Sequence, residues 1–217
     1  MTHQPLNKMI NEPDPSRLIH GLRDTGYDFY TAAADIIDNS VSADANIINI
    51  LIEITSDGRK FVYFGDDGHG MDEDGLHNAM RYGAQIREDL ASLGKFGLGL
   101  KTASSSVCLK YSLISRTNLS SPLYKLTWDL EHVSDVNNWE MVDEPVSVDE
   151  QEVFEELCGN SGTLVVWSRC DRLLSKVYEE PGGTKEQAAI RYISNKLIEH
   201  CALIFHKYLN PSETGYR

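Results

Sequence analysis

The sequence predicts an α+β fold in which one mostly antiparallel β-sheet is covered by helices. Three observations support this prediction. Isoleucines alternate on one face of the segment from Ile47 to Ile54, the turn signal at Asp57 and Gly58 leads into the apolar run KFVYF, and apolar residues recur at helical spacing over about 185–209. Helix and strand segments mix without strict βαβ alternation, which disfavours a doubly wound parallel sheet.

Composition limits the class of protein. The chain has 217 residues, of which 41% are hydrophobic and 24% are charged, as expected for one large globular domain. The 20 basic and 33 acidic residues give a net charge of −13, which opposes non-specific binding to nucleic acid. No apolar run has the length of a membrane span and the first residues lack the features of a signal peptide, so a cytoplasmic protein without membrane association is expected. The 4 cysteines contain no C-x-x-C pair and are expected to be reduced, structural thiols.

The predicted organisation is a polar arm over residues 1–20, expected to be mobile, followed by one domain over 21–217. Prolines punctuate the arm. Within the domain, the pattern predicts helices at about 27–43, 73–82, from about 98, and at 185–209. A β-hairpin is expected, with its first strand at 47–54 and its second strand ending at 65. Further strands are expected at 111–115, 124–128 and 164–167.

The predicted helix over 27–43 contains the polar sequence DIIDNS. At 100° per residue, Asp35, Asp38, Asn39 and Ser42 fall on one side, and an apolar group that also contains Ser40 covers the other. Solvated acids on an exposed helical face are the simplest explanation of such a stripe. The alternative is a set of side chains that converge on a ligand.

Two glycine-bearing stretches have the composition of ligand-binding loops. FGDDGHGM, residues 64–71, follows a predicted strand and places glycines, which allow close approach of a ligand, beside a carboxylate. GKFGLGLKTA, residues 94–103, precedes a predicted helix whose free amides would attract phosphate oxygens. This glycine spacing alone is weak, and the strand that a dinucleotide-binding unit requires before it is missing. A Rossmann fold is therefore disfavoured.

The order of these stretches is more specific than any one of them: the polar helix, the hairpin ending in DDGHG, then GKFGLG, then GT before a strand. Together they resemble the ATPase superfamily that unites gyrase B, the heat-shock 90-kDa chaperone, histidine kinases and MutL, known as GHKL. FGDDGHGM, GKFGLGLKTAS and DIIDNS are most similar to bacterial relatives of the MORC ATPases. The resemblance covers about Gly21 to Trp167 and implies a Bergerat-type two-layer α/β sandwich.

The resemblance implies ATP and Mg²⁺ as cofactors and a role for each matching residue. Asp35 falls at the position of the catalytic carboxylate that activates water, and Asn39, one helical turn later, at that of the magnesium ligand. Asp66 matches the carboxylate that reads the adenine amino group, and Thr163 the threonine that supports it through a shared water. The other matching residues border the base or the phosphates: Gly70 and Met71 at the adenine, and Gly94, Gly97, Leu98, Gly99, Leu100 and Lys101 at the phosphates.

Several of these residues have simpler explanations. Asp67, before a glycine, is assigned to turn chemistry. His69 has no second histidine at metal-ligand spacing and is assigned to a variable motif position. Met71 is more often a core residue, and an ordinary strand residue is the alternative for Thr163. For Lys101, a solvated surface position has about the same weight as the phosphate contact.

Two departures from the family pattern affect the expected activity. Position 35 holds aspartate where the family usually has glutamate, and because a misplacement of about 1 Å can lower a rate roughly a hundredfold, hydrolysis is expected to be slow. Relatives also carry a phosphate-sensing lysine on a following transducer domain. This chain ends at Arg217, so that domain is expected to be missing from it.

Three functions stay open on the sequence. The first is a magnesium-dependent, slow ATPase that drives nucleotide-gated dimerisation or a conformational change. The second is an ATP-sensing assembly module with little or no hydrolysis, and the third, less favoured, is a histidine-kinase-like phosphotransfer domain. The expected partners are ATP and a second copy of the chain, while association with DNA rests on family analogy and is expected to involve other segments.

Overall fold

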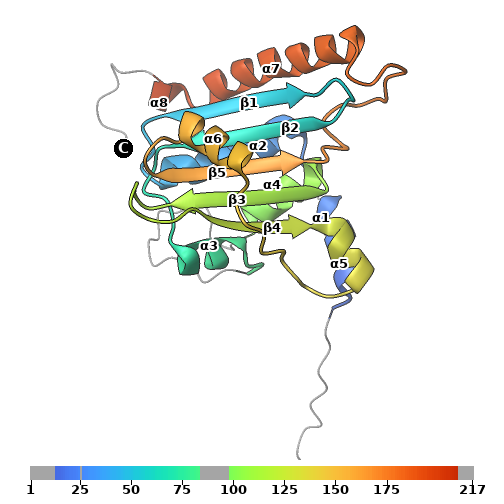
Figure 1. Cartoon of the computed structure of the whole chain (residues 1–217). Helices are drawn as coiled ribbons and strands as arrows, with labels where there is room; N and C mark the ends of the chain where they lie inside the picture. Colours follow the sequence, from blue (N-terminus) through green and yellow to red (C-terminus); the bar gives the residue numbers. More distant parts are fainter. Residues whose placement is uncertain (1–12, 25, 84–97, 210–217) are drawn as a thin grey trace, which may run out of the picture.

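The computed structural model describes residues 13–24, 26–83 and 98–209 and contains one sheet flanked by helices (Figure 1). Neighbouring strands are all antiparallel, in the order β1-β2-β5-β3-β4. The strands are β1 Ile48–Ile54, β2 Lys60–Asp66, β3 Lys110–Arg116, β4 Tyr124–Asp129 and β5 Gly162–Ser168. The predicted α+β class is confirmed, and this open sheet with packed helices agrees with the Bergerat fold that the resemblance implies.

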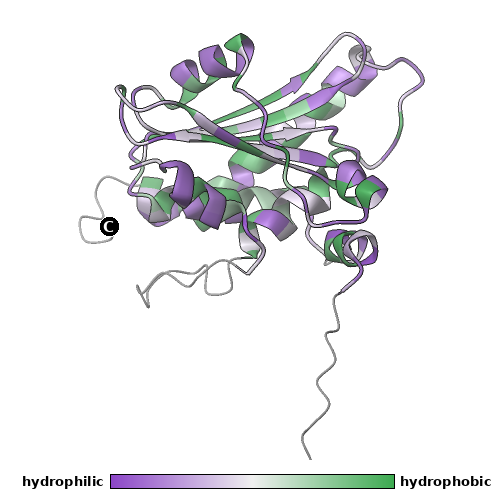
Figure 2. Cartoon of the chain, turned by 60° about the horizontal axis from the view of Figure 1, so that its bottom comes forward, coloured by the Kyte–Doolittle hydropathy of each residue, from purple (hydrophilic) through white to green (hydrophobic). Residues whose placement is uncertain are grey.

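The described helices pack on both faces and along the edges of the sheet (Figures 1 and 2). They are α1 Pro15–Arg23, α2 Phe29–Ser42, α3 Glu73–Met80, α4 Gly99–Val107, α5 Leu130–Val136, α6 Val148–Leu157, α7 Thr184–Ile204 and α8 His206–Leu209. The helix predicted over 185–209 is therefore interrupted after Ile204. Of the described helices, none is both long and apolar enough to cross a membrane.

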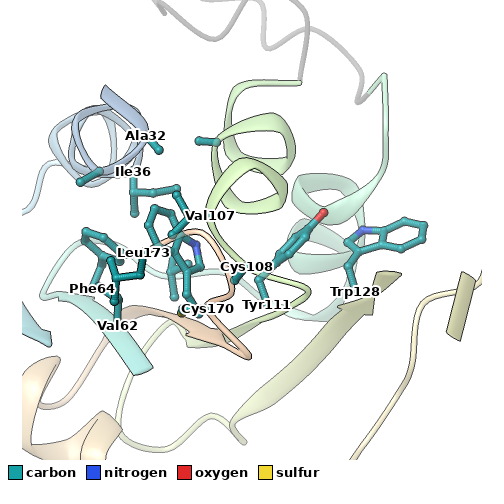
Figure 3. Close-up of a cluster of buried hydrophobic side chains, with 14 of the residues drawn as sticks. Ala32, Ile36, Val62, Phe64, Val107, Cys108, Tyr111, Trp128, Cys170 and Leu173 are labelled. Carbon is teal, nitrogen blue, oxygen red and sulfur yellow. The ribbon is translucent and has the colours of Figure 1, made fainter. Parts of the chain in front are cut away.

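The main core lies between the sheet and the pair α2 and α4. Figure 3 shows Ala32 and Ile36 from α2 and Val107 from α4 directed toward Val62 and Phe64 of β2. A second, smaller cluster fills the opposite face of the sheet. There, Phe154 of α6 and Cys158, the residue that follows this helix, pack on Ile114, Leu164 and Val166. The first cluster fixes α2 and α4 side by side on one face, and the polar stripe of α2 depends on that placement.

Strand β2, which lies between β1 and β5, is positioned by its register with both neighbours. Asp66, its last residue, lies opposite Ile48 in β1 and opposite Thr163 in β5. The β1–β2 connection contains Gly58 with φ of 83°, a left-handed conformation that favours glycine. A Cβ at Gly58 would lie 2.6 Å from the Pro181 side chain, so a second segment also requires the small residue.

Helix α1 differs from the arm predicted over residues 1–20. Asp14 caps it by accepting a hydrogen bond from the Arg17 amide at 2.8 Å, and Pro15 occupies its first position, where proline is favourable. Ile19 is fully buried in the main core. Residues 15–20 therefore belong to the folded domain; residues 1–12 lie outside the described part of the chain.

Candidate functional site

Asp66 is held by hydrogen bonds to both of its carboxylate oxygens. It ends β2, and its side chain is buried. Its Oδ2 accepts a hydrogen bond from Ser40 Oγ at 2.8 Å, while Oδ1 accepts from the amides of Gly68 at 3.0 Å and Thr163 at 3.3 Å. Burial raises the pKa of Asp66 above its usual range, although these three donors act in the opposite direction by favouring the ionised form.

Thr163 lies beside Asp66 because β2 and β5 pair in this register. Its backbone amide makes the contact to Asp66, and its hydroxyl lies 3.0 Å from Ser115 Oγ. Ser115 in turn accepts from the Met71 amide at 2.8 Å and donates to the Gly162 carbonyl at 2.7 Å. Strands β3 and β5 thereby hold the loop that follows Asp66.

Two glycines allow this loop to approach its neighbours closely. Gly70 has φ of 63°, and a Cβ there would lie 2.0 Å from the Arg116 carbonyl oxygen. Gly162 has φ of 128°, and its Cβ would lie 1.8 Å from the Asp66 carbonyl oxygen. Both positions exclude any larger residue by backbone contact as well as by conformation. Met71, next to Gly70, packs against the main core.

Asp67 has a different role from Asp66. Its Oδ1 accepts hydrogen bonds from the amides of Asn46 at 2.7 Å and Ile47 at 2.8 Å, just before β1. The side chain therefore stabilises the turn region, as turn chemistry predicts.

The polar stripe of α2 faces the beginning of α4. Asp35 is half-buried, and its Oδ2 accepts a hydrogen bond from the Tyr27 hydroxyl at 2.7 Å. A Cβ added at Gly99, the first residue of α4, would lie 3.7 Å from the same oxygen, so the Asp35 carboxylate faces this end of α4. Asp38, also half-buried, has a pKa raised by burial and by the negative charge of Asp35.

Asn39 fits a ligand of a nucleotide-bound magnesium ion. It is exposed, and its Nδ2 donates to the Asp35 backbone carbonyl at 2.8 Å, which turns the amide oxygen away from that contact. Magnesium in nucleotide sites is bound through one or two protein oxygens together with the phosphates and water. Among residues 13–24, 26–83 and 98–209, no group of three or more His, Cys, Asp or Glu could hold a metal ion.

The N-terminus of α4 is the predicted phosphate end of the site. Leu98 is its N-cap residue and no side chain caps it among the described residues, so the first-turn amides, including those of Gly99 and Leu100, have no side-chain acceptor. These amides and the positive end of the helix dipole favour an anion. Gly94 and Gly97 lie outside the described residues.

Lys101 is directed elsewhere than its expected phosphate contact. Its side chain is buried and its Nζ donates to the Ala79 carbonyl at 2.8 Å, at the end of α3. Lys101 follows Gly99 by two residues, so their positions differ by about 200° around the axis of α4. Lys101 therefore points into the protein. Trp128 Nε1 donates to the next carbonyl, that of Met80, at 2.9 Å. Both side chains satisfy terminal carbonyls of α3.

We expect Lys101 to make the stability of the protein depend on pH. Burial lowers the pKa of Lys101 to about 8 from its usual 10.5. Between these values the unfolded chain binds the proton and the folded chain does not, so the free energy of unfolding should rise with pH by up to about 3 kcal/mol. Urea unfolding of the parent and of Lys101→Met from pH 7.5 to 10.5 should show the free energy of unfolding of the parent rising by this amount relative to the variant.

The comparison with Lys101→Met is necessary because other groups titrate in the same range. Burial raises the pKa of Cys158 and of Cys170 to about 12, which lowers stability as the unfolded thiols ionise. Both proteins share these groups, so the difference between their pH profiles isolates Lys101. An unchanged difference from pH 7.5 to 10.5 would contradict the assignment.

A groove of about 610 Å³ lies apart from these residues. It is bordered by α3, β4 and the segment 139–146, and none of the predicted site residues lines it. The position of the groove therefore gives no support to the predicted nucleotide site, which rests on the contacts around Asp66 and Asp35.

Sequence reasoning missed three residues that contact the predicted site. Ser40 was placed on the apolar side of α2, yet it donates to Asp66. A lone hydroxyl on an apolar face was the available signal, because a buried polar group requires a partner. Tyr27 and Ser115 gave no such signal. Tyr27 precedes α2, so helical spacing does not relate it to Asp35, and Ser115 contacts Met71, which is distant in the sequence.

Comparison with known proteins agrees with the motif order. Residues 27–163, more than half of the chain, match the family described as histidine kinase-, DNA gyrase B- and HSP90-like ATPase. The chain is similar to Protein MICRORCHIDIA 3 of Arabidopsis thaliana, with 35% identity over 77 residues, 34% of this chain and 13% of that protein. It is also similar to ATPase MORC2B of Mus musculus, with 31% identity over 91 residues, 40% of this chain and 9% of that protein.

A human protein gives a similar result. ATPase MORC2 of Homo sapiens is 30% identical over 91 residues, 40% of this chain and 9% of that protein. The chain thus aligns with 9% to 13% of the length of these three relatives. The resemblance to GHKL ATPases with MORC-like motifs is confirmed.

Proposed function

Because the chain belongs to the histidine kinase-, DNA gyrase B- and HSP90-like ATPase family, we propose that it binds ATP with magnesium and hydrolyses it slowly. The bound nucleotide then controls dimerisation or a conformational change. The observation that carries the proposal is the buried carboxylate of Asp66, held in place by Ser40 and by two backbone amides.

Adenine recognition follows from the acceptor positions of Asp66. A carboxylate offers about four lone-pair positions, two on each oxygen. The amides of Gly68 and Thr163 occupy those of Oδ1, and Ser40 occupies one on Oδ2. Among the described contacts, one acceptor position on Oδ2 is left, and it suits the amino group of adenine. Guanine would present a carbonyl oxygen there and would be repelled.

The phosphate end of the proposed site lies between α2 and α4. The first-turn amides of α4, with Leu98, Gly99 and Leu100, contact the phosphates, and Asn39 supplies an oxygen to magnesium. When bound, the metal offsets negative charge on the phosphate oxygens. Asp35 accepts the proton of a water molecule aligned with the terminal phosphate. The short aspartate side chain is the reason for slow turnover.

Calorimetric titration with a non-hydrolysable ATP analogue and magnesium tests the nucleotide site directly. We expect binding of the ATP analogue and binding of the corresponding GTP analogue that is at least about 100-fold weaker, because a buried acceptor rejects a ligand that cannot donate to it. Equal affinity for the two analogues would contradict adenine recognition by Asp66. Absence of binding by the folded chain would contradict the proposed site.

A second candidate function is an ATP-sensing assembly module with little hydrolysis. The aspartate at position 35 favours it, since a shorter catalytic side chain slows hydrolysis and leaves the ATP-bound state long-lived. Sedimentation with ATP and with its non-hydrolysable analogue separates the two candidates. Dimerisation by ATP that reverses on hydrolysis supports the ATPase, and a dimer that persists while ATP remains intact supports the module.

The setting of this activity is also a proposal. The four cysteines are free, which fits a reducing compartment such as the cytoplasm. The net charge of −13 argues that any contact with DNA is made by other segments or partners.

A further inference from the structure

Tyr27 donates a hydrogen bond to the proposed catalytic carboxylate of Asp35. It lies just before the N-cap residue of α2, Asp28, and eight positions before Asp35. Its hydroxyl donates to Asp35 Oδ2 at 2.7 Å. The Thr102 side chain of α4, whose own hydroxyl donates to the Leu98 carbonyl at 3.0 Å, lies near enough to the phenol to lower its pKa. The contact is separate from the helix cap, because Asp28 itself caps α2 through the Thr31 amide at 2.8 Å.

The contact between Tyr27 and Asp35 is fixed by packing on both sides. Tyr27 is half-buried and its ring packs against the main core, while Asp35 is held on the rigid second turn of α2. The hydrogen bond to Asp35, together with burial, raises the pKa of Tyr27. The phenol therefore stays protonated at neutral pH and keeps donating to the carboxylate.

We propose that Tyr27 is a positioning residue that holds the Asp35 carboxylate in the orientation required for hydrolysis. This inference rests on the proposed function. Tyr27 takes one acceptor position on Oδ2 and leaves the other positions of the carboxylate open to the proton of the attacking water. The hydrogen bond also removes rotational freedom from the carboxylate, and pre-organisation of this kind raises the fraction of time spent in a reactive geometry.

Tyr27 is matched to aspartate rather than to glutamate at position 35. The hydroxyl lies only 2.7 Å from Asp35 Oδ2. One more methylene would move the carboxylate forward by about 1.5 Å, the length of one carbon–carbon bond, and into the space of that hydroxyl. The tyrosine thus takes up the room that the shorter acid leaves, and it compensates for part of the lost reach by fixing the carboxylate.

The test is the effect of Tyr27→Phe, which removes only the hydroxyl, in two backgrounds. With Asp35 in place, we expect kcat for ATP hydrolysis to fall about tenfold while the Kd of the ATP analogue stays within about twofold. In the Asp35→Glu background, we expect the same substitution to raise kcat, because it removes the group that the longer acid meets. Tyr30→Phe, one turn later on α2 and outside the site, is the matched control and should change neither value.

The outcomes separate this inference from the proposed function. An unchanged kcat in Tyr27→Phe, or an equal fall in both backgrounds, would overturn the positioning role because a purely structural residue behaves in that way. A parent that binds the analogue without any turnover would also overturn it, while leaving the nucleotide site intact. A parent that binds no analogue would overturn the proposed function and the role of Tyr27 with it.

Discussion

Replacing Asp66 by asparagine is expected to weaken binding of the ATP analogue by at least about 100-fold. The amides of Gly68 and Thr163 both donate to Oδ1, so the asparagine oxygen must take that position and its NH₂ group must replace Oδ2. The NH₂ group would then meet the amino group of adenine, and two donors would face each other in a buried site. Calorimetric titration of parent and variant measures the effect.

The adjacent residue supplies the control for Asp66→Asn. Asp67→Asn makes the same chemical change, but its side chain binds the amides of Asn46 and Ile47 and lies outside the proposed site. This variant should bind the ATP analogue as the parent does, even where its melting temperature falls. If Asp66→Asn binds with parental affinity, adenine is recognised by other groups.

Asp35→Asn is expected to lower the rate of ATP hydrolysis by roughly 10²- to 10⁴-fold, because an amide cannot accept the proton of the attacking water. Binding of ATP should persist, since adenine is bound by Asp66 and its partners, whereas the Asp35 side chain accepts a hydrogen bond from Tyr27. Dimers formed with ATP should consequently last longer in the variant. Phosphate release and sedimentation with ATP measure the two effects separately.

Asp44→Asn is the isosteric control for Asp35→Asn. Asp44 is exposed and has φ of 56°, a conformation that asparagine also tolerates. Its substitution should leave turnover unchanged. Parental turnover by Asp35→Asn would mean that another group activates the water, and loss of nucleotide binding in that variant would require a different assignment of α2.

The strands and the longer helices could be predicted because their patterns are local. The β1–β2 hairpin follows from alternating isoleucines and a turn at Gly58, and the predicted helix over 27–43 differs from α2 by only a few residues. Helices α5 and α6 were not predicted. The capping box of Ser147 and Glu150 at the start of α6 was a usable signal, because each side chain satisfies a backbone amide of the other's residue.

The burial of polar segments and of charged side chains could not be predicted from local patterns. Residues 15–20 look polar and proline-bearing, yet Ile19 enters the core and Arg23 forms an ion pair with Asp171 at 2.6 Å. Lys101 shows the same limit, since a lysine after a glycine run suggests a phosphate contact whereas its position on α4 directs it to α3. In both cases the deciding neighbour is distant in the sequence.

The sequence by itself determined the fold class, the ATPase family and the chemical types in the proposed site, because these depend on periodicity and on the order of short motifs. Only the tertiary structure decided which side chains and amides hold Asp66 and Asp35 in place. Ser40 and Thr163 reach Asp66 through helix packing and strand register, and Tyr27 reaches Asp35 from the segment just before α2. The physical reason is that the direction and burial of a side chain depend on the elements packed around it, and these come from distant parts of the chain.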